Sequence, residues 1–380
     1  MRTVHCDGSP AAVAELAGAI AVVLDGAGPP VLPLGAAGRA PLPAAEITGT
    51  TAVVVATSGS GGEPKFVELS PVALRASAAA TRTRLGAARW LLALPAEHIA
   101  GVQVIVRALL AGDAPVTQDV RDGFRATDFA VATARLGAGP RCTSLVPTQL
   151  LRLLDAGGPA VEALQTYAAV LVGGAALDAR LRSRAEVAGV RVVPTYGMSE
   201  TAGGCVYDGF PLDGVQIKLD GDDGQVLIGG PILATGYLGR PDETAAAFAG
   251  GWFHTADLGQ WCGDRLEVLG RADDVIVTGG EKVVPAAVER ALAAQPGVRG
   301  ACVVGVPDPQ WGHLVAAVVV TDPATSPDHN RLRDAVRAAL GRAAVPRQML
   351  NLPELPLLGV GKPDRAAVTR LFTSIPIQPP

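Results

Sequence analysis

The sequence has very little lysine. Only four of its 32 basic residues are lysines, and the other 28 are arginines; the lysines are Lys65, Lys218, Lys282 and Lys362. With 36 acidic residues the formal net charge is −4, and the two signs are mixed along the chain. This balance argues against a nucleic acid or an anionic membrane surface as the main partner. Each of the few lysines therefore becomes a candidate for a specific task.

Cysteine and histidine are also scarce, with five of each among 380 residues. No CxxC pair or ligand-spaced cluster occurs, so neither a disulfide framework nor a zinc site is indicated. The first 30 residues contain an apolar run, but Asp7 precedes it and Glu15 interrupts it, which is unlike a signal peptide. No run reaches the ~18 apolar residues that span a bilayer. We expect a soluble, reduced, cytoplasmic protein.

The pattern of apolar residues predicts a mixed α/β and α+β fold. Continuous apolar runs alternate with segments of helical period, which is typical of strands in a sheet covered on both faces. These runs are residues 51–57, 90–95, 143–147, 168–174 and 190–197. After about residue 205, short strands with Asp/Gly turns predict antiparallel hairpins or a small barrel. From residue 275 a second strand and helix alternation begins, so we place a domain boundary after Arg271, between domains 1–271 and 272–380.

The segment TSGSGGEPK, residues 57–65, directly follows an apolar strand. Its small residues let backbone N–H groups converge on an anion, its hydroxyls add donors, and Lys65 adds a positive charge, which is phosphate-binding chemistry. It is not a Walker A loop, because Pro64 precedes the lysine and Phe66 follows it. A flexible Gly/Ser surface turn is the alternative.

The segment YGMSET, residues 196–201, follows another strand. Tyr196 could stack on a base, Ser199 could contact a phosphate, and Glu200 could bind Mg²⁺. A strand-end turn with a helix-capping serine explains the segment equally well. Asp257, between a turn and a strand, suits a pair of ribose hydroxyls, although an ordinary Asp turn is the alternative. Lys362 lies in a Gly/Pro-flanked loop near the C-terminus, where a solvated lysine is the simpler interpretation.

Taken together, in this order and spacing over residues 57–365, these segments resemble the adenylate-forming superfamily of acyl- and aryl-CoA ligases, luciferases and peptide-synthetase adenylation domains. The resemblance implies a large N-terminal domain of helix-covered sheets with a small barrel-like β unit, and a small mobile α+β C-terminal domain. It also implies ATP, Mg²⁺ and coenzyme A as co-substrates and cofactor. An NTPase of the P-loop class is excluded by Pro64 and Lys65.

The resemblance assigns roles to individual residues. Glu200 would hold Mg²⁺, Ser199 would lie near the α-phosphate, and Lys362 would bridge the carboxylate and the α-phosphate during adenylation. Asp273 falls at the position about which the C-terminal domain rotates, and Gly279 and Gly280 would line the thiol tunnel. The nucleotide contacts implied are Thr57, Ser58, Gly59, Ser60 and Lys65 at the phosphates, Gly174, Ala175, Tyr196 and Gly197 at adenine, and Asp257 and Arg271 at the ribose.

Within the superfamily, the segments around His98, Ser144 and Tyr196 look most like o-succinylbenzoate–CoA ligases of menaquinone biosynthesis. In that group the His98 position borders the aromatic acid, and Arg107 can meet a carboxylate; a surface arginine is the alternative. The chain is short for the superfamily before residue 57, which suggests an N-terminally trimmed form. The resemblance implies an aromatic dicarboxylic acid, ATP and CoA as partners, no nucleic acid, no stable membrane insertion, and it allows a homodimer.

Two other functions stay open. One is another acyl- or aryl-CoA ligase, or a stand-alone adenylation domain that loads a carrier protein. The other is a nucleotide-binding protein that has lost catalysis, but a pure binder has no need of Lys362 on a mobile loop, and Glu200 also argues against it.

Overall fold

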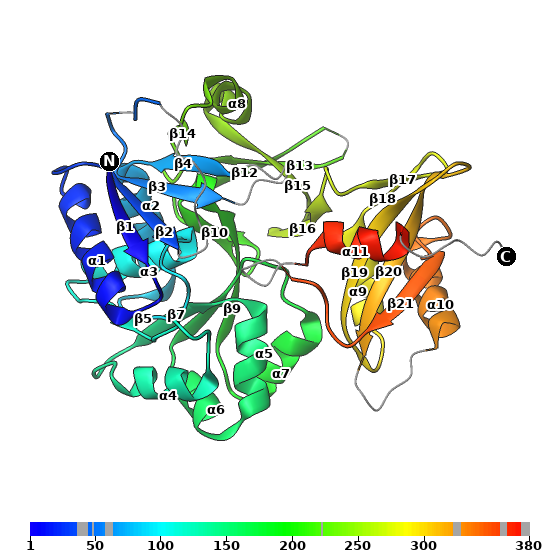
Figure 1. The fold of residues 1–380 in the computed structure, drawn as a ribbon, viewed down its shortest axis with the longest axis horizontal. Coiled ribbons are helices and arrows are strands. Elements are labelled where there is room, and N and C mark those ends of the chain that lie inside the picture. The colour runs from blue at the N-terminus through cyan, green and yellow to red at the C-terminus, as the bar shows by residue number, and fades with distance from the viewer. Residues whose placement is uncertain are drawn as a thin grey trace.

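A computed structural model gives the fold of the protein. It describes residues 1–35, 45–47, 49–57, 64–221, 223–321, 328–357 and 363–373. A large body contains the chain from the N-terminus to Arg271, and a smaller body beside it contains the strands from Ile276 onward (Figure 1). No helix within the described residues is long and apolar enough to cross a membrane.

The first sheet of the large body has five strands in the order β1-β2-β3-β4-β14. They are β1 (Arg2–Cys6), β2 (Val31–Gly35), β3 (Val53–Thr57), β4 (Lys65–Leu69) and β14 (Gly236–Tyr237). β1, β2 and β3 run parallel, whereas β4 is antiparallel to both β3 and β14. Thr57 and Lys65 form the last pair between β3 and β4, so the predicted phosphate segment connects the adjacent ends of two paired strands.

The second sheet has seven strands in the order β11-β10-β9-β8-β7-β5-β6. They are β11 (Phe210–Pro211), β10 (Gly203–Tyr207), β9 (Val192–Met198), β8 (Ala169–Val172), β7 (Arg141–Leu145), β5 (Arg89–Leu92) and β6 (Val116–Thr117). The strands from β9 to β6 are parallel, and β10 turns back along β9. β8 is buried at every position, as expected for a strand covered by helices on both faces.

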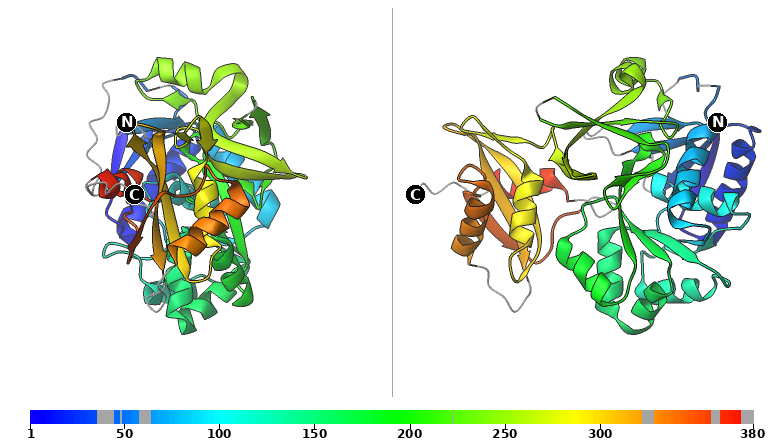
Figure 2. Two further views of the ribbon diagram at one scale, coloured as in Figure 1. Left: turned by 90° about the vertical axis from the view of Figure 1, so that its right-hand side faces the viewer. Right: turned by 180° about the vertical axis from the view of Figure 1, so that it is seen from behind.

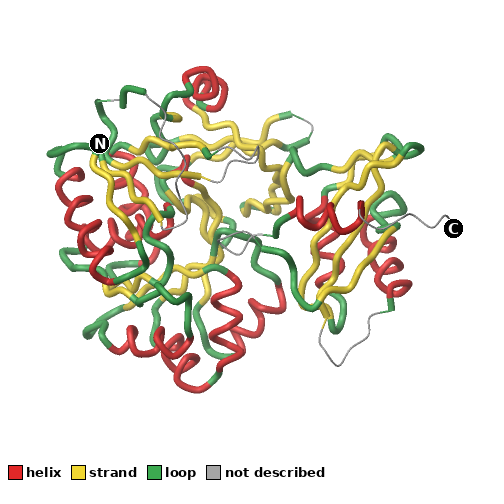
Figure 3. The backbone as a smooth tube through the Cα atoms, viewed as in Figure 1, coloured by secondary structure: helices red, strands yellow, loops and turns green. Residues whose placement is uncertain are grey.

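Helices cover both faces of this second sheet (Figure 3). One apolar core joins the first sheet, the second sheet and the helices α1 (Pro10–Leu24), α2 (Pro71–Leu85) and α3 (Ile99–Leu110). A second core packs the outer helices α4 (Ala126–Ala134), α5 (Pro147–Ala156), α6 (Gly158–Gln165) and α7 (Ala179–Val187) on the other face. α1 and α2 begin alike, with Ser9 or Ser70 capping the helix before a proline at its first position.

The third sheet is antiparallel, in the order β12-β13-β15-β16. Its strands are β12 (Gln216–Asp220), β13 (Gln225–Gly229), β15 (Trp252–Cys262) and β16 (Arg265–Arg271). The short helices η1 (Ser199–Thr201), α8 (Pro241–Ala247) and η2 (Ala249–Gly251) lie before β10, after β14 and before β15. Of the two arrangements predicted for this unit, the structure has hairpins in an open sheet, with β12 and β16 as its edges.

The smaller body is a single sheet with helices on both faces (Figure 2). Its strands are β17 (Ile276–Thr278), β18 (Glu281–Val283), β19 (Val298–Asp308), β20 (Gly312–Thr321) and β21 (Gln348–Leu352). Its helices are α9 (Pro285–Ala293) and α10 (His329–Leu340), which share one apolar core, and α11 (Arg365–Thr373), which packs in another. The α+β organisation predicted for this region is confirmed.

Candidate active site

The structure joins Tyr196 and Asp257, two residues predicted to contact a nucleotide. The hydroxyl of Tyr196, in β9, donates a 2.7 Å hydrogen bond to Oδ2 of Asp257, in β15. Burial, and then the charge of Asp257, raise the pKa of Tyr196, so this hydroxyl stays protonated at neutral pH. A strand end of the second sheet and a strand of the third therefore share one wall of the site.

Arg271 and Asp273 extend this group toward the smaller body. Arg271 Nη1 lies 3.8 Å from Asp257 Oδ1, and Arg271 makes two hydrogen bonds of 2.8 and 2.6 Å to the carboxylate of Asp273. The paired guanidinium lowers the pKa of Asp273. The predicted ribose contact is thus tied directly to the predicted hinge position.

Thr255 positions Asp257 from within β15, a role that no motif in the sequence predicts. Its hydroxyl donates to Val226 O at 2.7 Å and accepts from the backbone N–H of Asp257 at 2.9 Å. Gln225 adds a 2.7 Å bond to Thr255 O from the neighbouring strand β13. Because Thr255 is only 2% exposed, these bonds hold the Asp257 backbone in place.

The turn that carries Ser199 and Glu200 is held by Thr201, which is fully buried. Thr201 Oγ1 accepts the N–H of Met198 at 3.0 Å and lies 2.8 Å from Gly203 O. Ala234 N also donates to Glu200 O at 2.8 Å, so the backbone beneath the carboxylate is held from a distant loop. The predicted metal ligand is therefore on a rigid support.

Gly197 is required by packing. A Cβ at this position would lie 2.2 Å from Gly203 O and 2.6 Å from Gly204 Cα, so a larger residue would push β9 and β10 apart. Gly174 and Ala175 follow the end of the neighbouring strand β8, at the same edge from which Tyr196 extends. Gly174 has φ +80°, which a side chain would strain.

On the phosphate side, Lys65 is paired with an acid that was not predicted. Its Nζ lies 2.7 Å from Glu243 Oε2, in α8, and 4.6 Å from the centre of the Tyr237 ring. Tyr237 in turn donates a 3.0 Å hydrogen bond to Glu200 Oε1. Thr57 Oγ1 bonds to Lys65 O at 3.3 Å, which ties the two strand ends together. The predicted phosphate contacts Ser58, Gly59 and Ser60 lie outside the described residues, as does Lys362.

His98 and Arg107, the two predicted acid contacts, lie at different ends of α3. His98 is the residue before the helix, and Ile99 and Gln103 face Gly203, just after the Glu200 turn. Arg107 is nine residues further on, about 13 Å along a helix.

Arg107 is neither a surface arginine nor a member of the nucleotide group. It is 7% exposed, donates to Tyr207 Oη at 3.2 Å, and its guanidinium carbon lies 5.0 Å from the centre of the Trp90 ring. Trp90 lies near the start of β5, whereas the segment with His98 follows the end of that strand. Both predictions for Arg107, a surface cation and a ligand of the acid's carboxylate, lack support in these contacts.

The predicted tunnel glycines lie within the smaller body. Gly279 and Gly280 form the turn between β17 and β18, both with positive φ. A Cβ on Gly279 would lie 2.7 Å from the Trp311 ring, and Gly279 N donates to Trp311 O at 2.9 Å. In this orientation of the two bodies, the turn packs on Trp311 and is not bonded to the nucleotide group.

A few polar contacts join the two bodies. Arg180 Nη2, at the start of α7, donates to Ala294 O at 2.6 Å, just after α9. Lys282 Nζ lies 2.7 Å from Asp223 Oδ2, and Arg290 Nη1 donates to Leu269 O at 3.2 Å. These contacts hold the smaller body in its present orientation.

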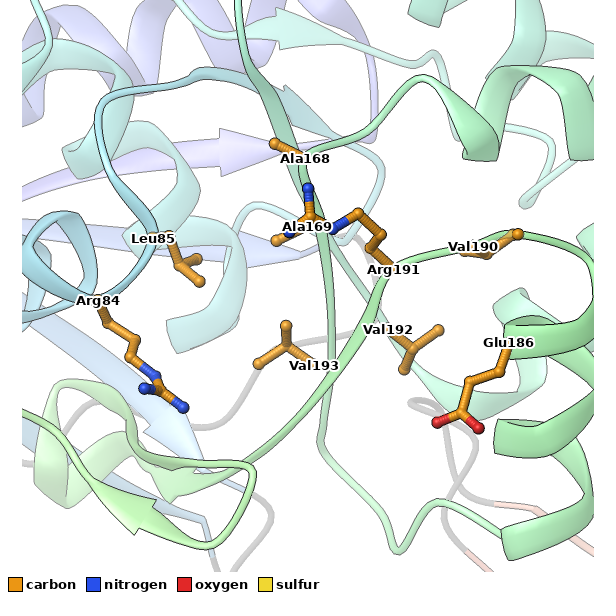
Figure 4. Close-up of a pocket in the computed structure, with 10 residues that line it drawn as sticks. Arg84, Leu85, Ala168, Ala169, Glu186, Val190, Arg191, Val192 and Val193 are labelled. Atoms are coloured by element: carbon orange, nitrogen blue, oxygen red, sulfur yellow. The ribbon is translucent and has the colours of Figure 1, made fainter.

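A cavity of about 530 Å³ opens elsewhere, at the amino ends of β8 and β9 (Figure 4). Arg84, Glu186 and Arg191 line it together with apolar side chains. Tyr196 lies in the carboxyl-terminal half of β9, and Gly174 follows the carboxyl end of β8. This cavity is therefore separate from the residues that bond to one another around Tyr196 and Glu200.

Comparison with known families agrees with this arrangement. Residues 10–238 match the family described as AMP-binding enzyme, and residues 287–362 match the AMP-binding enzyme C-terminal domain. The chain belongs to the AMP-binding enzyme family. The predicted membership of the adenylate-forming superfamily is thus confirmed.

Relatives of this AMP-binding enzyme include 2-succinylbenzoate–CoA ligases. It is 46% identical over 334 residues, 86% of each chain, to a probable 2-succinylbenzoate–CoA ligase of Mycobacterium tuberculosis. It is 32% identical to a 2-succinylbenzoate–CoA ligase of Geobacillus kaustophilus over 84% of this chain and 69% of the relative.

Solved structures share the fold of this AMP-binding enzyme. The o-succinylbenzoate CoA synthetase of Bacillus subtilis, in complex with its acyl-adenylate intermediate, has a TM-score of 0.73 at 28% identity, covering 84% of this chain and 69% of that one. An amide bond synthetase of Marinactinospora thermotolerans has a TM-score of 0.76 at 29% identity, covering 90% and 75%. The predicted fold class is confirmed.

Proposed function

We propose that this chain is an ATP-dependent o-succinylbenzoate–CoA ligase, an AMP-forming acid–thiol ligase of menaquinone biosynthesis. The observation that carries the proposal is the 46% identity, over 86% of both chains, to a relative with that name. The Tyr196, Asp257 and Arg271 group supports it, because it joins an aromatic ring, a carboxylate and a guanidinium where a nucleoside would need them. ATP, Mg²⁺ and CoA belong to the same proposal, as does a cytoplasmic location, where both co-substrates are supplied.

The proposed reaction has two steps. In the first, a carboxylate oxygen of the acid attacks the α-phosphorus of ATP, and the bond from that phosphorus to pyrophosphate breaks. In the second, the thiolate of CoA attacks the acyl carbon, and AMP leaves with the electrons of the broken C–O bond. The first step brings two anions together, so positive charge near the α-phosphate lowers its barrier.

The residues divide this work. Tyr196 and Gly197, with Gly174 and Ala175, would border adenine. Asp257 and Arg271 would take the ribose, and Lys65 would take the outer phosphates together with Thr57, Ser58, Gly59 and Ser60. Ser199 would contact the α-phosphate, and Lys362 would bring its ammonium to the carboxylate and the α-phosphate.

Glu200 is a suitable holder for Mg²⁺. It presents one half-buried carboxylate on the rigid turn after β9. The described residues contain no group of three or more His, Cys, Asp or Glu side chains that could hold a metal ion by themselves. Mg²⁺ is commonly held in this way, by one or two carboxylates together with substrate phosphates and water. When bound, the ion would neutralise phosphate charge as the bond to pyrophosphate breaks.

The two bodies would then change their relative orientation between the steps. Residues 272–275 connect β16 to β17, so rotation there, at Asp273, would move Lys362 away and bring the Gly279–Gly280 turn in to guide the thiol. His98 would border the aromatic acid. We leave Arg107 out of the acid contacts, because its hydroxyl and ring partners belong to the core.

The test is ATP–pyrophosphate exchange over a panel of carboxylic acids, followed by a thioester assay with CoA. We expect o-succinylbenzoate to give by far the strongest exchange. A preference for benzoate or a fatty acid would overturn the proposed substrate and favour another acyl- or aryl-CoA ligase. Exchange with o-succinylbenzoate but no transfer to CoA would favour a carrier protein as acceptor.

Lys362→Ala tests the division into two steps. The variant should lose exchange by about 10²–10³-fold, as for loss of one charge that stabilises a transition state. It should largely retain thioester formation from supplied acyl-adenylate. Equal loss of both steps would contradict the role proposed for Lys362.

A further inference from the structure

Tyr237 is a buried tyrosine that the proposed mechanism does not use. It ends the two-residue strand β14, which pairs with β4 so that Tyr237 lies opposite Val67. It is 7% exposed, yet both its hydroxyl and its ring contact charged side chains. A buried residue with two charged neighbours, Glu200 and Lys65, calls for an explanation beyond packing.

The first contact is with the metal candidate. The Tyr237 hydroxyl donates to Glu200 Oε1 at 3.0 Å. Hydrogen bonds to a carboxylate are stronger and more directional than those between neutral groups, so this bond fixes the rotation of the carboxylate. An ionised carboxylate can only accept, so the phenol O–H is the donor in this bond.

The second contact is with the phosphate-segment lysine. Lys65 Nζ lies 4.6 Å from the centre of the Tyr237 ring, within the range of a cation–π interaction. Within the described part of the chain, this ammonium also forms a 2.7 Å ion pair with Glu243, whose side chain is 42% exposed. The ring therefore offers Lys65 a buried contact that remains when a phosphate replaces Glu243 as the partner of the ammonium.

Tyr237 itself is held firmly. Its backbone N–H donates to Thr244 Oγ1 at 2.9 Å, and the next residue, Leu238, donates to Phe66 O at 2.8 Å. The Phe248 ring packs against its ring, with centres 5.7 Å apart. Neither the hydroxyl nor the ring can move far without breaking these contacts.

We propose that Tyr237 is a positioning residue that couples the metal ligand to the phosphate-binding lysine. Its hydroxyl orients the Glu200 carboxylate for Mg²⁺, and its ring holds Lys65 toward the outer phosphates of the same ATP. The proposal rests on the roles proposed above for Glu200 and Lys65. It predicts that the two parts of Tyr237 affect ATP binding differently. The hydroxyl should matter only when Mg²⁺ is bound, whereas the ring should matter both with and without Mg²⁺.

The test is calorimetric titration of the full chain with ATP, once with excess Mg²⁺ and once with EDTA. Tyr237→Phe keeps the ring and removes the hydroxyl. It should weaken binding of the magnesium complex by about tenfold, the effect of losing one hydrogen bond to a charged group, and leave metal-free ATP within about twofold. Tyr237→Leu also removes the ring, so it should weaken metal-free ATP as well.

Tyr167→Phe is the matched control. Tyr167 is also a buried tyrosine, with its hydroxyl 2.8 Å from Thr133 among the outer helices, and neither titration should change. Thermal unfolding of each variant checks that it is folded.

Equal loss with and without Mg²⁺ in Tyr237→Phe, or no loss, would overturn the proposal for Tyr237 alone, provided the native chain binds ATP in a Mg²⁺-dependent way. Absence of Mg²⁺-dependent ATP binding in the native chain would overturn the proposed function, and the proposal for Tyr237 with it.

Discussion

Tyr196 and Asp257 are 61 positions apart in the sequence, and their side chains meet in a 2.7 Å hydrogen bond. The bond links β9, which precedes the Glu200 turn, to β15, which pairs with β16, the strand that leads into the linker between the two bodies. Through Arg271, the same carboxylate is connected to Asp273. A nucleoside bound here would therefore contact residues that are connected to the proposed hinge at Asp273.

Loss of this bond should reduce ATP affinity in a non-additive way. Asp257→Asn and Tyr196→Phe should each weaken ATP binding by about tenfold. Because the two side chains are bonded, the double variant should lose clearly less affinity than the product of the two single losses. Calorimetric titration of a double-mutant cycle measures this. Asp155→Asn, which alters a surface pair with Arg184, is the control. Additive effects would show that the two residues act on ATP independently.

Glu243 should compete with ATP for Lys65. Both partners are partly exposed, so their ion pair contributes at most about 1 kcal/mol, and phosphate can displace the carboxylate at low cost. Glu243→Gln should therefore tighten ATP binding by about threefold. Asp242 is the exposed neighbour of Glu243 in α8, and Asp242→Asn should leave the affinity for ATP unchanged. Weaker binding in Glu243→Gln would mean that Glu243 instead holds Lys65 in its productive place.

Arg107 should affect stability and leave the acid's KM alone. Its side chain fills space between the Trp90 ring and the Tyr207 hydroxyl. Arg107→Ala should lower the free energy of unfolding by about 2–4 kcal/mol through the void it leaves, and Arg107→Met should recover part of that loss. Chemical denaturation and steady-state kinetics measure the two quantities. A raised KM for the acid at unchanged stability would restore the predicted contact with a carboxylate.

Arg180 should control the orientation of the smaller body. Its guanidinium bonds to Ala294 O at 2.6 Å and to Val298 O at 3.4 Å across the two bodies. If the second step requires rotation at Asp273, Arg180→Ala should slow adenylation by about threefold, the effect of one weakened contact, and not slow thioester formation from supplied acyl-adenylate. Single-turnover assays separate the steps. Arg184→Ala, in the same helix, is the control, and equal changes in both steps would contradict this role.

The thiols should show a simple pattern of reactivity and pH dependence. Burial raises the pKa of Cys6, Cys205 and Cys302 to about 12 and that of Cys142 to about 11, from 9.0. Since folding favours their neutral form, the stability they contribute is present below pH 9 and is lost as pH rises from there toward 11–12. Only Cys262 is exposed, so a thiol reagent at pH 8 should modify one cysteine of five in the folded chain.

Two measurements check the thiol pattern. Cys262→Ser should abolish the fast reaction, and melting temperatures should fall between pH 9 and 11. Rapid modification of two or more thiols in the folded chain would contradict the burial.

Much of the fold could be predicted from apolar runs alone. The runs at 51–57, 168–174 and 190–197 became β3, β8 and β9, with ends shifted by a few residues. Such runs are informative because a strand covered on both faces is mostly apolar, as β8 is, although β9 is only half-buried along its length. The choice between hairpins and a barrel depended on how β12 and β16 pair, and that is decided by contacts between distant strands.

Residues suited to nucleotide chemistry can be recognised from local motifs. Tyr196, Glu200 and Lys65 stand in motifs at strand ends, whereas Asp257, predicted between a turn and a strand, lies within β15. The contacts of those side chains depend on how distant segments pack in the folded chain. The tertiary structure paired Tyr196 with Asp257, placed Tyr237 between Glu200 and Lys65, and put Arg107 against Trp90 in the core. Local spacing sets the direction of a strand or helix, but a hydrogen bond or a ring contact forms only where packing brings two remote segments within a few ångströms.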